Sequence, residues 1–170
     1  MIITDNPFEI MSPEKRWKPS TTSGGQLAYP PLVEMIRDEV FEWRNNGYPG
    51  ISSITKSLLK WWFIERDFEK DLQYYFCQRE AIESIIYLYE FRNVRTKSDL
   101  IKFDKYKVLD EKLIDENWLR FVIKMATGSG KTKVMSLALV WSYFHKTLIP
   151  DSTLSTNFLI IAPYVIVLER

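Results

Sequence analysis

Apolar residues in the first half of the chain recur at helical spacing. Between residues 31 and 45 they stand three or four positions apart, as on one face of a helix: Leu32, Ile36, Val40 and Trp43. Pro31 suits a first helical turn, and Asn45-Asn46-Gly47 is a typical stop signal. This pattern predicts a first helix over residues 31–45.

Two further helices are predicted after the turn at Tyr48-Pro49-Gly50. Ser52 or Ser53 is suited to cap the second helix, whose apolar positions are Ile54, Leu58, Trp61 and Trp62. The third helix runs from about Gln78 to Glu90, with an apolar stripe of Ala81, Ile82, Ile85, Ile86 and Tyr89.

The pattern changes after residue 119. Residues 121–125 and 157–162 are short apolar runs of β-favouring character, and residues 131–145 between them are typical of a buried helix. Continuous apolar strands on either side of a helix indicate a parallel βαβ unit, so the predicted fold class is α/β. We divide the chain into an irregular arm (1–30), a helical region (31–75) and an incomplete α/β domain (76–170), with an insertion at 91–117.

Composition fits an ordinary soluble globular protein, with 46% hydrophobic and 26% charged residues. The net charge of +1 neither favours nor excludes nucleic-acid binding, because a motor protein can use a local basic patch. The single cysteine, Cys77, agrees with a cytoplasmic location, and we expect neither a signal peptide nor a membrane span. Cys77 and the single histidine, His145, lie far apart, which argues against a zinc site.

The strongest chemical signal is the segment Ala126-Thr127-Gly128-Ser129-Gly130-Lys131-Thr132, which we predict binds a nucleoside triphosphate. A phosphate-binding loop directs backbone N–H groups at an anion, and Gly128 and Gly130 permit the required backbone angles. The loop opens a helix, whose N-terminal N–H groups add to anion binding. In such a site Lys131 reaches the β- and γ-phosphates and the Thr132 hydroxyl ligates Mg²⁺, so these two residues are the catalytic candidates.

One position departs from the strict phosphate-loop pattern. Met125 stands where the pattern has glycine, five residues before Gly130. The alternative interpretation is a glycine-rich turn with an incidental Lys-Thr pair. The strand predicted before the segment and the helix predicted after it favour the phosphate loop.

Two weaker candidates lie outside the loop. The Gln78 amide can donate and accept at the edge of an adenine, although a surface or capping glutamine is an equal alternative from the residues alone. Residues 160–164 lie where helicases place a loop that touches the nucleic-acid backbone, although from the residues alone a core strand ending at Pro163 is the favoured interpretation.

Three segments resemble superfamily 2 helicase-like proteins: Phe76–Glu83, Lys124–Thr132 and Leu159–Pro163. The closest likeness is to the restriction (Res) subunit of type III restriction enzymes and related DEAD/DEAH-type restriction endonucleases. Shorter segments look like the leader of that group: Asn6–Phe8, Arg16-Trp17, Trp43–Gly50 and Leu58–Trp62. The resemblance therefore touches most of the chain.

The resemblance implies an ATP-dependent helicase or translocase on double-stranded DNA, with a RecA-like P-loop NTPase domain and with ATP and Mg²⁺ as cofactors. By that match Gln78 contacts adenine, Gly128 to Thr132 hold the phosphates, and Pro163 and Tyr164 belong to a loop on the DNA side. Tyr164 departs from the small polar residue of many relatives. A methyltransferase or specificity subunit is the further partner that a restriction system suggests.

We expect the chain to be the front of a longer protein. The acidic strand-end motif, the second RecA-like lobe and any nuclease domain would follow Arg170. Two other hypotheses stay open: a different P-loop enzyme, such as a nucleotide kinase or AAA-type ATPase, and a truncated, non-catalytic interaction module. Gln78 and the Ala162-Pro163 strand exit argue against the first of these.

Overall fold

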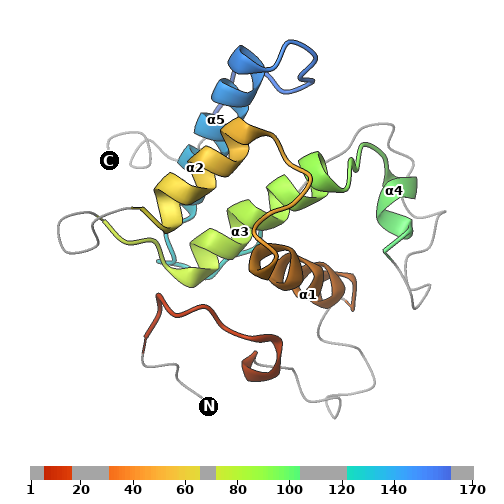
Figure 1. Ribbon diagram of the computed structural model, residues 1–170. Helices are drawn as coiled ribbons and strands as arrows, with labels where there is room; N and C mark the ends of the chain where they lie inside the picture. Colours follow the sequence, from red (N-terminus) through yellow and green to blue (C-terminus); the bar gives the residue numbers. More distant parts are fainter. Residues whose placement is uncertain (1–5, 17–30, 66–71, 104–121, 162–170) are drawn as a thin grey trace.

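The computed structural model describes residues 6–16, 31–65, 72–103 and 122–161. The elements in chain order are η1 Pro13–Lys15, α1 Pro31–Asn45, α2 Ser53–Phe63, α3 Phe76–Ile86, η2 Tyr87–Phe91, α4 Lys97–Ile101 and α5 Lys131–Leu148 (Figure 1). The turn η2 is π-helical and continues α3. Helix α3 runs through the middle and contacts both α1 and α5, and α2 packs beside α5.

The first two predicted helices are confirmed, and their ends have clear local causes. Gly47, at φ 73°, ends α1: its N–H donates to the Arg44 carbonyl, and the Tyr48 N–H donates to the Trp43 carbonyl, both at 3.0 Å. These two bonds make a Schellman motif, which requires a left-handed residue that glycine adopts without strain. Ser52 caps α2, because its side chain accepts a hydrogen bond from the Thr55 N–H.

The other two predicted helices are confirmed with shifted ends. The third begins at Phe76, two residues earlier than predicted, and its final turn is η2. Helix α5 continues to Leu148, three residues further than predicted. The side chain of His145 in its last turn lies 2.7 Å from the Ser152 hydroxyl, which ties the following turn to the helix.

One apolar core joins all four long helices. Its buried members include Val40 and Trp43 of α1, Leu59 and Trp62 of α2, Ile82 and Ile86 of α3, and Leu137 and Trp141 of α5. Burial of these side chains stabilises the arrangement, because removing one large apolar side chain from water contributes roughly 1.5–3 kcal/mol. The core includes residues on both sides of the predicted boundary at residue 75.

The first part of the predicted insertion packs against this core. Val94 and Phe103 are buried, and α4 lies between them with a Thr96 side chain that caps the Asp99 N–H. Residues 104–117 of the predicted insertion lie outside the described residues. In the part of the chain that the structure describes, no helix is both long and apolar enough to cross a membrane.

The predicted α/β fold class, a RecA-like domain beginning with a parallel βαβ unit, is wrong for the residues that the structure describes. Residues 122–125 and 157–161 contain no strand, and no backbone hydrogen bond joins these two described segments. Val122, Leu159 and Ile161 are 90%, 87% and 83% exposed. A strand exists only by pairing with a neighbour, whereas an apolar run in a sequence specifies no partner. The described part of the chain is helical.

Candidate phosphate-binding site

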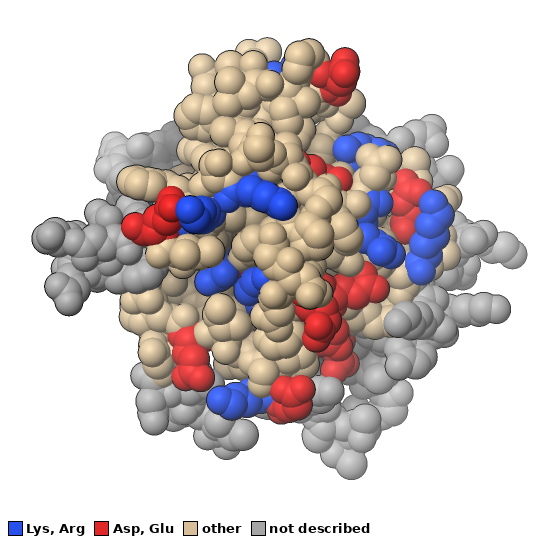
Figure 2. All heavy atoms as spheres, in the orientation of Figure 1, with Lys and Arg blue, Asp and Glu red and all other residues tan. Residues whose placement is uncertain are grey.

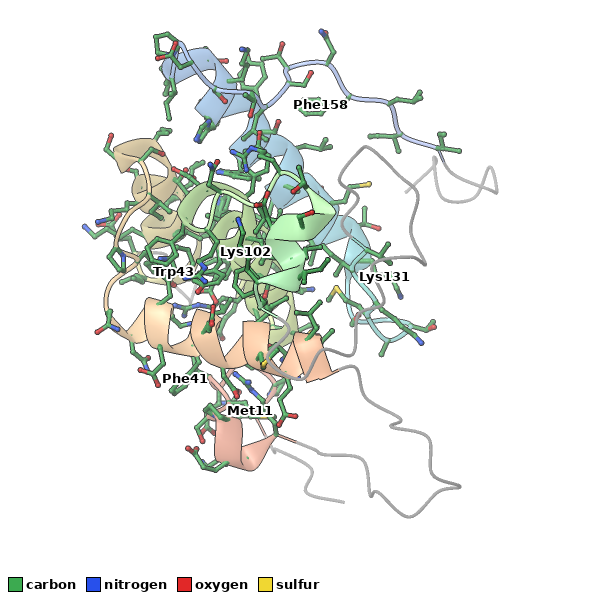
Figure 3. All side chains as sticks on the ribbon, turned by 90° about the vertical axis from the view of Figure 1, so that its right-hand side faces the viewer. Met11, Phe41, Trp43, Lys102, Lys131 and Phe158 are labelled. Carbon is green, nitrogen blue, oxygen red and sulfur yellow. The ribbon has the colours of Figure 1, made fainter. Side chains whose placement is uncertain are left out.

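The predicted phosphate loop forms a tight turn that leads directly into α5. Gly128 and Gly130 both have φ of 80°, a left-handed conformation that costs other residues about 1–2 kcal/mol. Gly130 is the N-cap residue of α5, so Lys131 is the first residue of the helix. Figure 3 shows Lys131 at this end of α5, well apart from Phe158 in the segment that follows the helix.

The Ala126 carbonyl closes the loop by accepting three hydrogen bonds. They come from the Ser129 N–H at 3.3 Å, the Ser129 hydroxyl at 2.7 Å and the Lys131 ammonium at 2.8 Å. The Lys131 side chain therefore folds back over the loop. A neutral carbonyl is a weaker partner for an ammonium group than a phosphate oxygen, because charge-assisted hydrogen bonds are the stronger ones. Phosphate is thus chemically suited to displace this contact.

The first turn of α5 offers the donors that an anion needs. The backbone N–H groups of Lys131 and Thr132 have no hydrogen-bond acceptor among the described residues, and no acidic residue lies in this turn. Lys131 and Thr132 are both exposed. An exposed helix N-terminus with free N–H groups favours anions through those groups and the helix dipole. Residues 128–132 therefore fit the phosphates of a nucleotide.

The Thr132 hydroxyl fits the predicted role of Mg²⁺ ligand. It is exposed and has no hydrogen-bond partner among the described residues. No group of three or more His, Cys, Asp or Glu side chains in the described ranges could hold a metal ion. Among the loop residues, Thr132 would thus be the side chain that contacts Mg²⁺, and phosphate oxygens and water would supply further ligands.

Gln78 reaches the loop from 51 positions earlier in the chain. Its amide nitrogen donates to the Ser129 carbonyl at 2.9 Å, and its amide oxygen accepts from the Tyr75 N–H at 3.0 Å. The residue is buried, with 5% of its surface exposed. An amide group has two N–H bonds and two lone pairs, so one of each is left for another ligand. Its contact with adenine stays a prediction.

Replacing Gly130 with Ala tests the packing of Gln78 on the loop. A Cβ atom on Gly130 would lie 2.1 Å from the Gln78 amide nitrogen, whereas a Cβ atom on Gly128 would meet nothing within 4 Å. Gly128→Ala is therefore a matched control, since both glycines have the same φ. We expect a loss in the free energy of unfolding of about 1–2 kcal/mol for Gly128→Ala, from backbone strain alone.

Gly130→Ala is expected to cost about 1 kcal/mol more than the control, because the Gln78 hydrogen bond to Ser129 is lost as well. Denaturant unfolding measures both the strain and the loss of the Gln78 hydrogen bond. It is carried out on the two glycine variants alone and on each combined with Gln78→Ala. The extra cost should vanish in the Gln78→Ala background. Equal costs for the two glycine variants in the wild-type background would show that Gln78 does not pack on the loop.

One cavity among the described residues lies away from the phosphate loop. It has a volume of about 520 Å³ and is lined by residues of η1, α1 and η2, among them Pro13, Trp43 and Tyr87. No residue of the phosphate loop lines it.

Comparison with known proteins reports one family. The model of the family described as type III restriction enzyme, res subunit matches residues 70–170, which is more than half of the chain. The chain belongs to this family. Neither the curated proteins nor the solved structures contain a significant match. The family match spans both Gln78 and the loop, whereas the arm, α1 and α2 precede it.

Two of the predicted site residues cannot be placed. Pro163 and Tyr164, the candidates for contact with nucleic acid, lie outside the described residues, as does Ala162. Ala126 and Thr127 are exposed at the start of the loop. Of these two residues, Ala126 makes hydrogen bonds within the loop among the described residues, through its carbonyl. The loop and Gln78 are thus the part of the predicted site that the structure brings together.

Three residues near Gln78 were not predicted from the sequence. Tyr75 orients the amide, and two buried glutamates, Glu80 and Glu83, follow on the same helix. Glu80 and Glu83 lie outside the apolar stripe predicted for this helix, where a charged residue is ordinarily assigned to the surface. Their partners, however, come from distant parts of the chain that local spacing does not reveal.

Proposed function

We propose that the chain binds Mg²⁺–ATP through residues 126–132 and serves as the nucleotide-binding part of a DNA translocase or helicase in a restriction system. The observation that carries the proposal is the turn with two left-handed glycines, which ends in the first turn of α5, where the N–H groups of Lys131 and Thr132 have no acceptor among the described residues. Membership of the type III restriction enzyme res subunit family supports it, since helicase-like members of this kind depend on ATP.

Each predicted residue has a distinct role in this proposal. The backbone from Ala126 to Gly130 surrounds the phosphates, and the Lys131 ammonium leaves the Ala126 carbonyl to bind the β- and γ-phosphates. The Thr132 hydroxyl ligates Mg²⁺. Gln78 uses its remaining amide N–H and lone pair toward adenine. When bound, Mg²⁺–ATP would supply the energy for movement along DNA.

The partners follow from the family in general. We propose that the full-length protein translocates on double-stranded DNA and that a methyltransferase subunit is its protein partner in the restriction system. On the face shown in Figure 2, basic and acidic side chains are interspersed, so the described surface there offers no uniform basic tract for DNA. The proposed DNA contact is instead assigned to Pro163, Tyr164 and further residues of the full-length protein.

Binding of a fluorescent ATP analogue with Mg²⁺ tests the nucleotide site. Lys131→Ala is expected to weaken binding by about tenfold to a hundredfold, the effect of removing one hydrogen bond to a charged group. Lys133→Ala is the matched control, because Lys133 is also exposed in the first turn of α5 but makes no side-chain contact with the Ala126 carbonyl. Equal losses for the two variants, or no binding by the folded wild type, would refute the proposal.

A further inference from the structure

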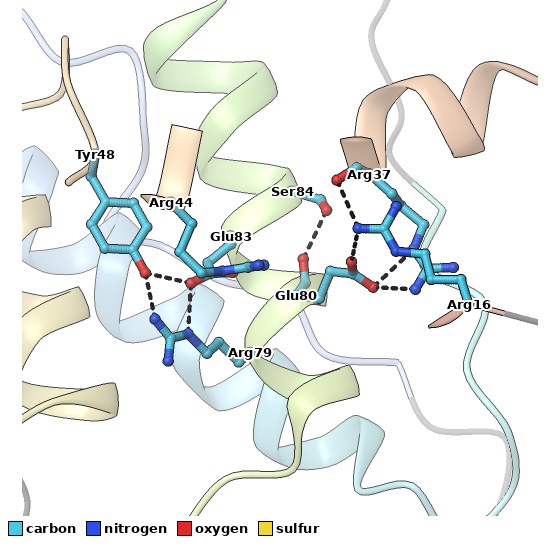
Figure 4. Close-up of polar contacts among 8 residues, drawn as sticks. All are labelled: Arg16, Arg37, Arg44, Tyr48, Arg79, Glu80, Glu83 and Ser84. Carbon is cyan, nitrogen blue, oxygen red and sulfur yellow. Dashed lines mark hydrogen bonds and ion pairs between the residues drawn. The ribbon is translucent and has the colours of Figure 1, made fainter. Parts of the chain in front are cut away.

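Helix α3 carries two buried carboxylates close to Gln78. Glu80 is 7% exposed and Glu83 is fully buried. Figure 4 shows how arginines from three parts of the chain converge on them. Charged groups are almost never buried this deeply unless they are paired, so the partners of Glu80 and Glu83 must be held in defined positions around them.

Glu80 is held by the N-terminal arm and by α1. The Arg16 guanidinium lies 3.3 Å from one oxygen of Glu80, and Arg37 donates to the other at 2.8 Å (Figure 4). Arg16 is itself buried and also binds Asp38 at 2.7 Å and the Arg37 carbonyl at 3.1 Å. A single arginine of the arm therefore joins α1 to α3.

Glu83 is held by α1, by the turn that follows α1 and by a neighbour on α3 itself. It accepts hydrogen bonds from Arg44, from the Tyr48 hydroxyl and from Arg79, the last at 2.8 Å (Figure 4). Glu80 and Glu83 stand three positions apart, close to one face of a helix. Glu80 is tied to residues 6–16 and to α1, and Glu83 is tied to α1 and to Tyr48 in the turn after it, so the two carboxylates together oppose rotation of α3 about its own axis.

The arm also contacts the turn in which Gln78 is oriented. The Phe76 N–H donates to the Pro7 carbonyl at 2.9 Å, and the rings of Phe8 and Tyr75 lie 5.2 Å apart. The Tyr75 N–H is in turn the donor to the Gln78 amide oxygen. Residues 7 and 8 thus stabilise the first turn of α3, and Arg16 binds Glu80, two residues after Gln78 on the same helix.

We propose that the N-terminal arm, residues 6–16, positions Gln78 against the phosphate loop and thereby sets the affinity of the chain for nucleotide, with Arg16 as the positioning residue. This inference rests on the proposed nucleotide site. The hydrogen bond from Gln78 to the Ser129 carbonyl is 2.9 Å long, and a rotation of α3 that moved the amide by about 1 Å would take it beyond hydrogen-bonding distance. Arg16 lies before residue 70 and so outside the family match, whereas Glu80 and Gln78 lie within it.

A double-mutant cycle separates positioning from general stabilisation. Arg16→Met, Gln78→Ala and the double variant are made in the 170-residue chain. The dissociation constant for the fluorescent ATP analogue with Mg²⁺ is measured at a temperature at which circular dichroism shows each variant to be folded. We expect Arg16→Met to weaken binding about fivefold, the equivalent of one neutral hydrogen bond. In the Gln78→Ala background, Arg16→Met should have no further effect.

The neighbouring residue supplies the control. Lys15 is exposed and pairs with Glu9 on the surface, so Lys15→Met should leave the dissociation constant unchanged. If Arg16→Met does not fold, Phe8→Ala tests the second contact of residues 6–16 with the start of α3, because it removes the ring that lies against Tyr75; it should weaken binding in the wild type and have no further effect in the Gln78→Ala background.

The outcomes distinguish the inference from the proposed function. Wild-type binding that Lys131→Ala abolishes but Arg16→Met leaves unchanged would overturn the arm's role and leave the nucleotide site intact. An equal loss from Arg16→Met with and without Gln78 would also overturn it, because the arm would then act by another route. Failure of the folded wild type to bind would reject both.

Discussion

Replacement of Glu83 by Ala is expected to lower the free energy of unfolding by about 3–5 kcal/mol, the usual cost of breaking a buried ion pair from one side. Glu83 is fully buried and is the acceptor for Arg44, Arg79 and the Tyr48 hydroxyl. Even with Glu83 present, one terminal nitrogen of Arg44 is buried without an acceptor among the described residues. The variant would leave further buried donors unpaired.

Urea unfolding followed by far-ultraviolet circular dichroism measures this effect. Glu83→Gln keeps the size of the side chain and removes its charge, so it separates the ionic contribution from that of packing. Glu65→Ala is the control, because Glu65 pairs with Lys60 at the exposed surface, where ion pairs contribute about 0–1 kcal/mol. A loss below about 1 kcal/mol for Glu83→Ala would show that the network does not stabilise the fold.

The protonation of Tyr48 agrees with this arrangement. Burial, followed by the negative charge of Glu83, raises the pKa of Tyr48 well above its usual range. The hydroxyl therefore keeps its proton and donates to Glu83 throughout the neutral pH range. Because the folded-state pKa is raised, the contribution of this hydrogen bond is fully present below the ordinary tyrosine pKa and is lost only in strong alkali.

The helices could be predicted because their causes are local. Leu32, Ile36, Val40 and Trp43 define the buried face of α1, and the stop at Gly47 is a property of a few consecutive residues. The same holds for the loop, since glycines at 128 and 130 and the lysine after them stand next to one another in the sequence. Short-range spacing therefore located four helices and the main elements of the candidate site.

The remaining features depend on contacts between distant residues. The apolar runs at 122–125 and 157–161 suggested strands, yet strand formation needs a partner that the run itself does not name. Arg16 and Glu80 are 64 positions apart, and a charged residue is ordinarily assigned to the surface. The bond from Gln78 to Ser129 was likewise not predictable from spacing, although both residues were identified as candidates.

Replacement of Trp141 by Ala is expected to lower the free energy of unfolding by about 3–5 kcal/mol, as for other large aromatic residues in a core. Trp141 is 3% exposed and lies edge-on against Tyr89, with ring centroids 5.6 Å apart. Its indole N–H donates to the Thr55 hydroxyl at 3.1 Å, and that hydroxyl donates to Glu90 at 2.7 Å. One side chain therefore joins α5 to α2 and to η2.

The control variants share the helix. Tyr143→Ala changes a residue that is 47% exposed and should cost under about 1 kcal/mol. Trp141→Phe keeps most of the ring and removes the N–H, so it should lose about 1 kcal/mol for the hydrogen bond and part of the packing contribution. A Trp141→Ala variant as stable as Tyr143→Ala would contradict the packing of α5 described above.

The effect of Trp141→Ala on nucleotide binding should differ from its effect on stability. Trp141 lies nearly three turns beyond Lys131, and the hydrogen bonds of the loop are made within residues 126–131 and to Gln78. At a temperature at which the variant stays folded, its dissociation constant for Mg²⁺–ATP should therefore match that of the wild type. Arg16→Met is expected to behave in the opposite way, with weaker binding by folded protein. This contrast separates residues that support the fold from residues that position the site.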